Sequence, residues 1–212
     1  MKKGIQILLI LVIIFLGYKV YTSIATPIDF QKELKLRNDA VVESLKNIRK
    51  AQLAFKEVNG KYTANWDSLV KFTKTGTLPL VRKIGALTDA QLEAGMTESE
   101  ALKQGIIIRD TVRIAVRDSL FGKSFEIDKL PFIPYTQNEK FFLGTNVITT
   151  GSGVKVPVFE ARAHNNQILS ELKDTYEQEI INLNEKRRVD GKYPGLKVGS
   201  LTETNNNAGN WE

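Results

Sequence analysis

The chain contains one histidine, His164, and no cysteine, so few of its residues could act as an acid–base or nucleophilic catalyst. A catalytic histidine needs a carboxylate or a nucleophile within reach, but the residues that follow His164 are Asn165 and Asn166. We therefore interpret His164 as a surface or capping residue at a strand-to-helix junction. The alternative is a membrane-anchored hydrolase, which would have to gather Asp and Ser side chains around His164 in one cleft.

Metal and phosphate sites have no clear signature either. Metal ions in proteins are held by His, Cys or clustered carboxylates, whereas the acidic residues here are dispersed among lysines, with no Asp-x-Asp-x-Asp loop. The Asn-rich residues 205–212 offer carbonyl oxygens and predict a polar tail. Gly151-Ser152-Gly153 lacks the Lys-Ser/Thr pair of a phosphate-binding loop and predicts a hairpin turn. We expect no cofactor and no metal, and a protein that is not an enzyme.

The charge of the chain is concentrated at its N-terminus. The net charge is +6, from 30 basic and 24 acidic residues, and residues 1–26 hold three of the basic residues and none of the acidic ones. The remaining residues are only weakly basic and their charges are scattered, which argues against a nucleic-acid partner. Without cysteines there is no disulfide framework, so the outer part of the chain must be stabilised by its own core.

Residues 5–25 form an apolar run that predicts a membrane anchor. The 22 residues from Gly4 to Ala25 would span about 33 Å as a helix, enough for a hydrocarbon core of about 30 Å. Lys19 lies inside this span and would direct its ammonium group toward the lipid headgroups. Lys2 and Lys3 would keep residues 1–4 in the cytoplasm. We expect a single pass through the inner (cytoplasmic) membrane, with the head in the periplasm or outside the cell. The alternative is a signal peptide cleaved after Ala25.

Residues 27–58 predict a long amphipathic stem helix that begins at Thr26-Pro27, where proline suits an early helical position. No glycine or proline interrupts it as far as Val58. Its apolar stripe recurs at close to seven-residue spacing and consists of Leu34, Val41, Leu45, Ile48 and Phe55. Such a stripe either packs on the chain's own head or forms a coiled coil between copies. Asn38 and Gln52 interrupt a coiled-coil seam.

The following residues, 59–204, predict an α+β head. Capping patterns at Thr88 and Thr97 begin two short helices. Alternating residues around 112–116 predict a strand, and residues 141–149 and 154–162 predict a hairpin. Pro157 lacks a backbone donor, which favours an edge position in that sheet. A C-terminal helix comes next, with Asn165 or Asn166 as its N-cap, and we expect the small antiparallel sheet to pack on the stem and this helix.

Two similar turns come after the two long helical stretches. Residues 58–62 read Val-Asn-Gly-Lys-Tyr and residues 189–193 read Val-Asp-Gly-Lys-Tyr. This pattern is either an internal repeat or one good helix-ending turn used twice.

Residues 48–62 and the Asp-Ser-Leu helix start after them resemble type IV pilins and type II secretion pseudopilins. The first four residues, Met-Lys-Lys-Gly, are similar to a prepilin leader. The sequence departs from the family at Ile5, where Phe or Met is usual, and at Leu9, where a Glu is usual. The resemblance implies a membrane helix that continues into an amphipathic stem, in a subunit of an envelope assembly.

These observations predict a non-enzymatic, single-pass subunit of a cell-envelope assembly that acts by protein–protein packing. Its expected partners are the lipid bilayer, through residues 5–25, and other membrane or envelope proteins, which include a second copy of the chain. The expected interaction residues are Leu34, Val41, Leu45, Ile48, Phe55, Tyr62 and Trp66. The alternative is a periplasmic ligand- or glycan-binding module with a cleaved leader.

Overall fold

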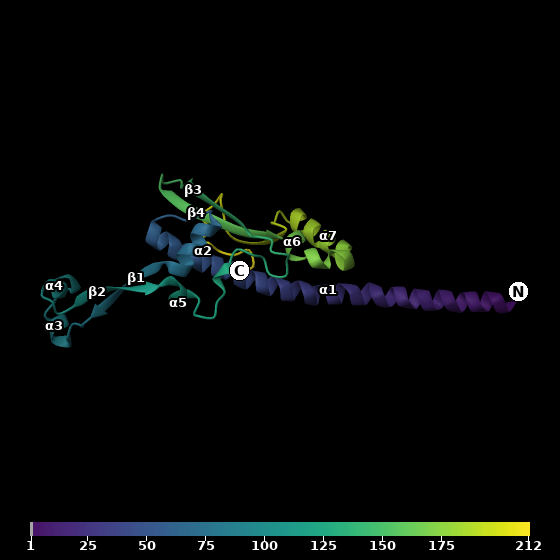
Figure 1. Cartoon of the computed structure of the whole chain (residues 1–212), viewed down its shortest axis with the longest axis horizontal. Helices are drawn as coiled ribbons and strands as arrows, with labels where there is room; N and C mark the ends of the chain where they lie inside the picture. The colour runs from purple at the N-terminus through teal and green to yellow at the C-terminus, as the bar shows by residue number, and fades with distance from the viewer. Residues whose placement is uncertain (1) are drawn as a thin grey trace. The chain divides into compact units, whose positions relative to one another are not determined.

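The computed structural model describes residues 2–212, apart from the side chains of Lys2 and Val81 (Figure 1). Met1, the first residue of the predicted cytoplasmic segment 1–4, lies outside the described residues. The fold is α+β, as the sequence predicts, with a long N-terminal helix, small antiparallel sheets and a C-terminal helix. Its elements in chain order are α1 (Lys2–Asn59), α2 (Trp66–Thr75), β1 (Thr77–Ile84), α3 (Asp89–Glu93), α4 (Glu98–Lys103), β2 (Ile108–Ala115), α5 (Val116–Leu120), η1 (Ile127–Lys129), β3 (Phe142–Thr149), β4 (Lys155–His164), α6 (Asn165–Ile168), η2 (Ser170–Leu172), α7 (Lys173–Val189) and β5 (Gly195–Gly199).

Helix α1 is continuous over 58 residues and contains Pro27 in its interior. Pro27 therefore lies inside the helix and not at its start, while the expected anchor continues into the expected stem as one helix. Proline has no N–H, so the carbonyl of Ser23 loses its usual helical donor at this point. The good helix formers after Pro27, and the apolar run before it, continue the helix across the missing hydrogen bond.

The contacts within the chain divide it into two compact units, whereas the sequence predicts one head over residues 59–204. The first, here the stem unit, comprises Met1–Ile48 and Pro131–Glu212, and the second, the inserted unit, comprises Arg49–Leu130. Helix α1 contributes to both, since its last turns lie beyond Ile48.

The stem unit contains a three-stranded antiparallel sheet in the order β3-β4-β5. β3 and β4 form the predicted hairpin, closed by the Gly153 N–H donating to the Thr150 carbonyl at 2.8 Å. β4 is the central strand of the sheet, so the predicted edge position of Pro157 does not hold for the strand as a whole. β5 pairs only with Glu160–His164, and Pro157 therefore lies on the part of β4 that has one neighbour, β3, where a missing N–H costs no ladder bond.

Residues 208–210 extend this sheet, in contrast to the polar tail predicted over 205–212. The Gly199 N–H donates to the Ala208 carbonyl, and the Asn210 N–H donates to the Lys197 carbonyl, both at 3.0 Å. The Asn210 side chain adds a further pair of bonds, accepting from the Lys197 N–H at 3.0 Å and donating to the Gly195 carbonyl at 2.9 Å. One side-chain amide thus supplies a donor and an acceptor to an otherwise open strand edge.

The inserted unit has its own small core around Ala54, Leu78 and Val116, against which Phe72, Ile114 and Leu120 pack. β1 and β2 form a two-stranded antiparallel sheet, and the predicted capping boxes begin α3 at Thr88 and α4 at Thr97. The strand predicted over 112–116 ends one residue early, because Val116 begins α5 instead.

The two similar turns both end a helix with a glycine at positive φ. Gly60 has φ +72° after α1, and Gly191 has φ +66° after α7. The next element differs between them, since the first turn leads to helix α2 and the second leads to strand β5. The pattern therefore has the same local role in both places, that of ending a helix.

Candidate functional site

The N-terminal part of α1 is exposed along an apolar surface. Its most apolar 18-residue window is not buried by any other part of the chain, and the helix is long and apolar enough to cross a membrane. The exposed large apolar side chains from Ile5 to Ile24 are Ile, Leu or Val, apart from the aromatic residues Phe15, Tyr18 and Tyr21. An uncovered apolar surface of this extent on a protein indicates an interaction with lipid or with another protein.

The predicted seam residues of the stem unit are buried inside the chain. Leu34 is 8% exposed, and Val41, Leu45 and Ile48 are fully buried. Of the two arrangements that the sequence leaves open, the structure has the one in which the stripe packs on the chain's own head. Another protein could reach these four side chains only if the head unpacked, so a partner surface must be sought elsewhere on the stem unit.

The remaining predicted interaction residues belong to the inserted unit. Phe55 packs edge-on against Phe72 with 5.1 Å between ring centroids. Tyr62 is buried, with the Lys56 ammonium group 4.9 Å from its ring, and Trp66 opens helix α2. Gln52, which interrupts the seam in the sequence, bonds both backbone groups of Thr63 and so holds the turn after α1 against the helix. These residues stabilise the start of the inserted unit.

Arg37 holds the stem against the head of the stem unit. Arginine is rarely buried in proteins, yet the Arg37 side chain is only 7% exposed. It donates to the Tyr135 carbonyl at 3.2 Å and to the Ile168 carbonyl at 3.3 Å. Its guanidinium group also lies 3.2 Å from the Glu171 carboxylate and 5.1 Å from the centroid of the Tyr135 ring.

The five donors of a guanidinium group explain why arginine suits this position, because they can reach several acceptors at once. Carbonyl oxygens from two separate segments, around residues 135 and 168, meet at the one side chain. The Arg37 Nε has no hydrogen-bond partner among the described residues, and Glu33 approaches it only to 4.0 Å. Only the position of Arg37 in the sequence indicates its burial. It lies three residues after Leu34 and four before Val41, which places it on the buried stripe itself.

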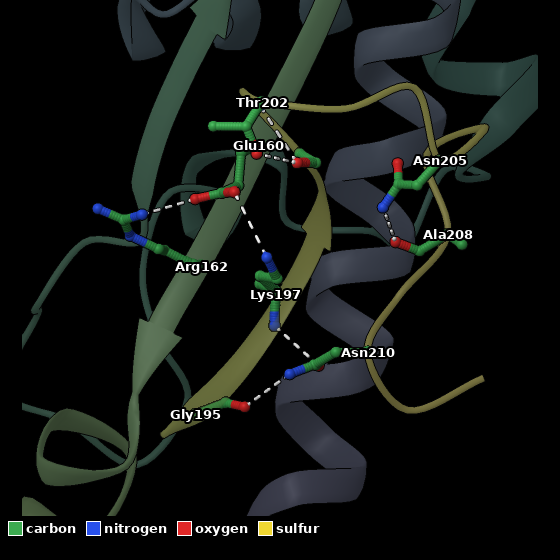
Figure 2. A network of polar contacts seen from close by, with 9 residues as sticks. Glu160, Arg162, Gly195, Lys197, Thr202, Asn205, Ala208 and Asn210 are labelled. Atoms are coloured by element: carbon green, nitrogen blue, oxygen red, sulfur yellow. Dashed lines mark hydrogen bonds and ion pairs between the residues drawn. The ribbon is translucent and has the colours of Figure 1, made fainter. Parts of the chain in front are cut away.

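A second polar network lies on β4 and β5 (Figure 2). Glu160 is 5% exposed, and its carboxylate lies 2.7 Å from the Arg162 guanidinium and 3.8 Å from the Lys197 ammonium group. Arg162 in turn lies over the ring of Phe142, 4.1 Å from its centroid. Two cations balance the carboxylate, so Glu160 is not left as an unpaired buried charge.

His164 is a helix cap, as predicted. Its Nδ1 accepts a hydrogen bond from the Asn166 N–H at 3.1 Å at the start of α6, so His164 takes the N-cap role that the sequence assigns to Asn165 or Asn166. Its ring packs edge-on against Tyr193 at 6.0 Å. Burial lowers the pKa of His164 and raises the pKa of Tyr193. An imidazole whose Nδ1 accepts a hydrogen bond from the backbone of the next helix has a structural role in this arrangement.

The polar side chains described above mainly hold segments of the stem unit together, although the buried Arg37 Nε and Asn38 Oδ1 have no hydrogen-bond partner among the described residues. Within residues 2–212, no three His, Asp or Glu side chains lie close enough together to hold a metal ion. Comparison of the chain with models of protein families, with curated proteins and with solved structures finds no match.

Proposed function

We propose that this protein is a non-enzymatic, single-pass subunit of a cell-envelope assembly, similar to a pilin or pseudopilin, that acts by packing against other proteins. The observation that carries the proposal is the continuity of α1. One helix supplies the exposed apolar segment over residues 5–25 and the stem over residues 27–58, with no break between them. A helix of this kind would hold its head at a fixed height above a membrane.

The Arg37 contacts support the same role. A head attached to the stem by a buried, multiply bonded arginine would move with the anchor as one body, as a subunit in an assembly requires. The positive-inside rule favours an N-terminus in the cytoplasm, through Lys2 and Lys3, and a head in the periplasm or outside the cell.

The experiment is to express the full chain, separate membranes from soluble protein and determine the first residue of the mature protein. A protein in the membrane fraction that begins at Met1 supports a plain anchor, and one that begins at Ile5 supports pilin-type processing. A soluble protein that begins at Thr26 would overturn the proposal, because the apolar segment would then be a discarded leader.

A further inference from the structure

A groove of about 350 Å³ lies between α6 and the first turns of α7 in the stem unit. Leu169, Ile180 and Ile181 form its apolar part, and Lys173 and Glu177 are among its polar lining residues. Ile181 is 46% exposed. No ion pair holds Lys173 or Glu177 to another residue in the described part of the chain. Leu169 and Ile180 are themselves buried, so the groove combines one exposed apolar side chain, that of Ile181, with two charged side chains that form no ion pair with the described residues.

Two contacts with α1 determine where this groove lies along the axis of the stem helix, and so how far it lies from the expected membrane. Arg37 bonds the Ile168 carbonyl, and Phe30 packs against Tyr176 at 5.5 Å. The segment from 168 to 176 therefore runs back along the stem toward the anchor. Tyr176 lies level with Phe30, five residues past Ala25, or about 7.5 Å along the helix. The groove accordingly lies beside the stem just above the expected membrane surface.

The stem has two exposed apolar residues at the same height, on the face opposite its buried stripe. Ile28 is 52% exposed and Leu36 is 54% exposed, with Lys32 between them at the same helical spacing. We call Ile28, Lys32 and Leu36 the outer stripe. Leu36 lies eleven residues past Ala25, about 16 Å along the helix, which is beyond the headgroup layer of a bilayer. Lipid therefore does not cover the upper part of the outer stripe.

We propose that the groove receives the outer stripe of a second copy of this chain, side by side in the same membrane. The inference rests on the proposed membrane anchor, since two copies anchored alike present the groove and the outer stripe at equal heights. Ile28 and Leu36 match the apolar part of the groove. Glu177 is free for the Lys32 ammonium group of the neighbour, whose side chain is 72% exposed and held only by an exposed pair with Asp29. Such exposed pairs contribute little and exchange readily.

Disulfide crosslinking tests this contact directly, because the natural chain has no cysteine. One copy carries Ile28→Cys and one epitope tag, and the other carries Ile181→Cys and a different tag. We expect mild oxidation of membranes from cells that express both copies to give a disulfide-linked pair that contains both tags. Leu36→Cys combined with Ile181→Cys is the second pair, in case Ile28→Cys lowers expression.

The matched control replaces Ile181→Cys by Val147→Cys, an apolar residue on β3 that is 58% exposed. We expect no mixed-tag product above background from this control. Glu177→Lys should lower the mixed-tag yield roughly two- to fivefold, and Lys32→Glu in the other copy should restore it. Protein found in membranes without a mixed-tag product from either test pair, or with equal product from the control, overturns this proposal alone. Protein absent from membranes overturns the proposed anchor and this inference together.

Discussion

Replacement of Arg37 by alanine should unfold the stem unit at a lower denaturant concentration. The change leaves the buried Ile168 carbonyl without its donor, at a cost of about 1–3 kcal/mol. It also removes the guanidinium group from the Tyr135 ring, at a cost of about 0.5–2 kcal/mol. Against this, the variant no longer buries the unpartnered Arg37 Nε. We expect a net loss of about 2–4 kcal/mol in the free energy of unfolding.

The assay is urea unfolding of the full chain in detergent micelles, monitored by tryptophan fluorescence. The chain has two tryptophans, Trp66 in the inserted unit and Trp211 in the stem unit. A Trp66→Phe background therefore leaves one probe, which reports on the stem unit. With a urea slope of about 2 kcal/mol per M, in the middle of the typical range, the expected loss corresponds to a midpoint lower by about 1–2 M.

Two further variants distinguish the contribution of the Arg37 hydrogen-bond donors from that of its ion pair with Glu171. Arg37→Met keeps most of the aliphatic packing and removes the donors, so it should be less harmful than Arg37→Ala. Glu171→Gln should cost less than about 1 kcal/mol, because the Glu171 side chain is 46% exposed and surface ion pairs are weak. The matched control is Arg188→Ala, at an arginine that is 72% exposed. If Arg37→Ala and Arg188→Ala had the same midpoint, the reasoning about Arg37 would be refuted.

Three other predictions concern the stem unit. Gly195→Ala should lower its melting temperature, because a Cβ there would lie 2.2 Å from the Ala163 carbonyl oxygen, whereas Gly151→Ala, with nothing within 4 Å, should not. Acid should weaken the His164 cap, because burial lowers the pKa of His164 in the folded state. The stabilisation by the cap is complete above the ordinary pKa of histidine and is lost as the pH falls through the lower folded-state pKa. His164→Asn, which keeps a capping oxygen, should lose less unfolding free energy than the natural chain when the pH falls from about 7.5 to about 5.5. Ile48→Asp should prevent folding of the stem unit by placing a carboxylate at a fully buried position, and an unchanged circular dichroism melting curve would contradict this.

The features that the sequence predicts correctly are local ones. The exposed apolar segment is predicted by composition, the stem by the spacing of residues such as Val41 and Ile48, and the capping boxes at Thr88 and Thr97 by side chains three residues apart. The hairpin around Gly151 depends on one turn and its two flanking strands. Each of these patterns is contained within a short stretch of chain, where spacing alone decides the structure.

The features that the sequence does not predict depend on distant segments. The burial of Arg37 requires carbonyls from residues 135 and 168, which no local pattern specifies. The role of Asn210 depends on strand β5 having an open edge beside it. The division into two units depends on the packing of residues 131–212 on the stem. The helical pattern of the sequence continues without interruption across Ile48, so it does not indicate where one unit ends and the other begins.

The insertion of one unit into the other sets an order for folding during synthesis. Arg37 can bond the Ile168 carbonyl only after a further 131 residues have been made. At a typical synthesis rate of about 5–20 residues per second, this interval lasts roughly 7–26 s. The inserted unit can fold during that interval, while the stem stripe stays uncovered and open to aggregation. The buried face of the stem helix would therefore be accessible to other proteins from the synthesis of Arg37 until the synthesis of Ile168, and slower synthesis would prolong this exposure.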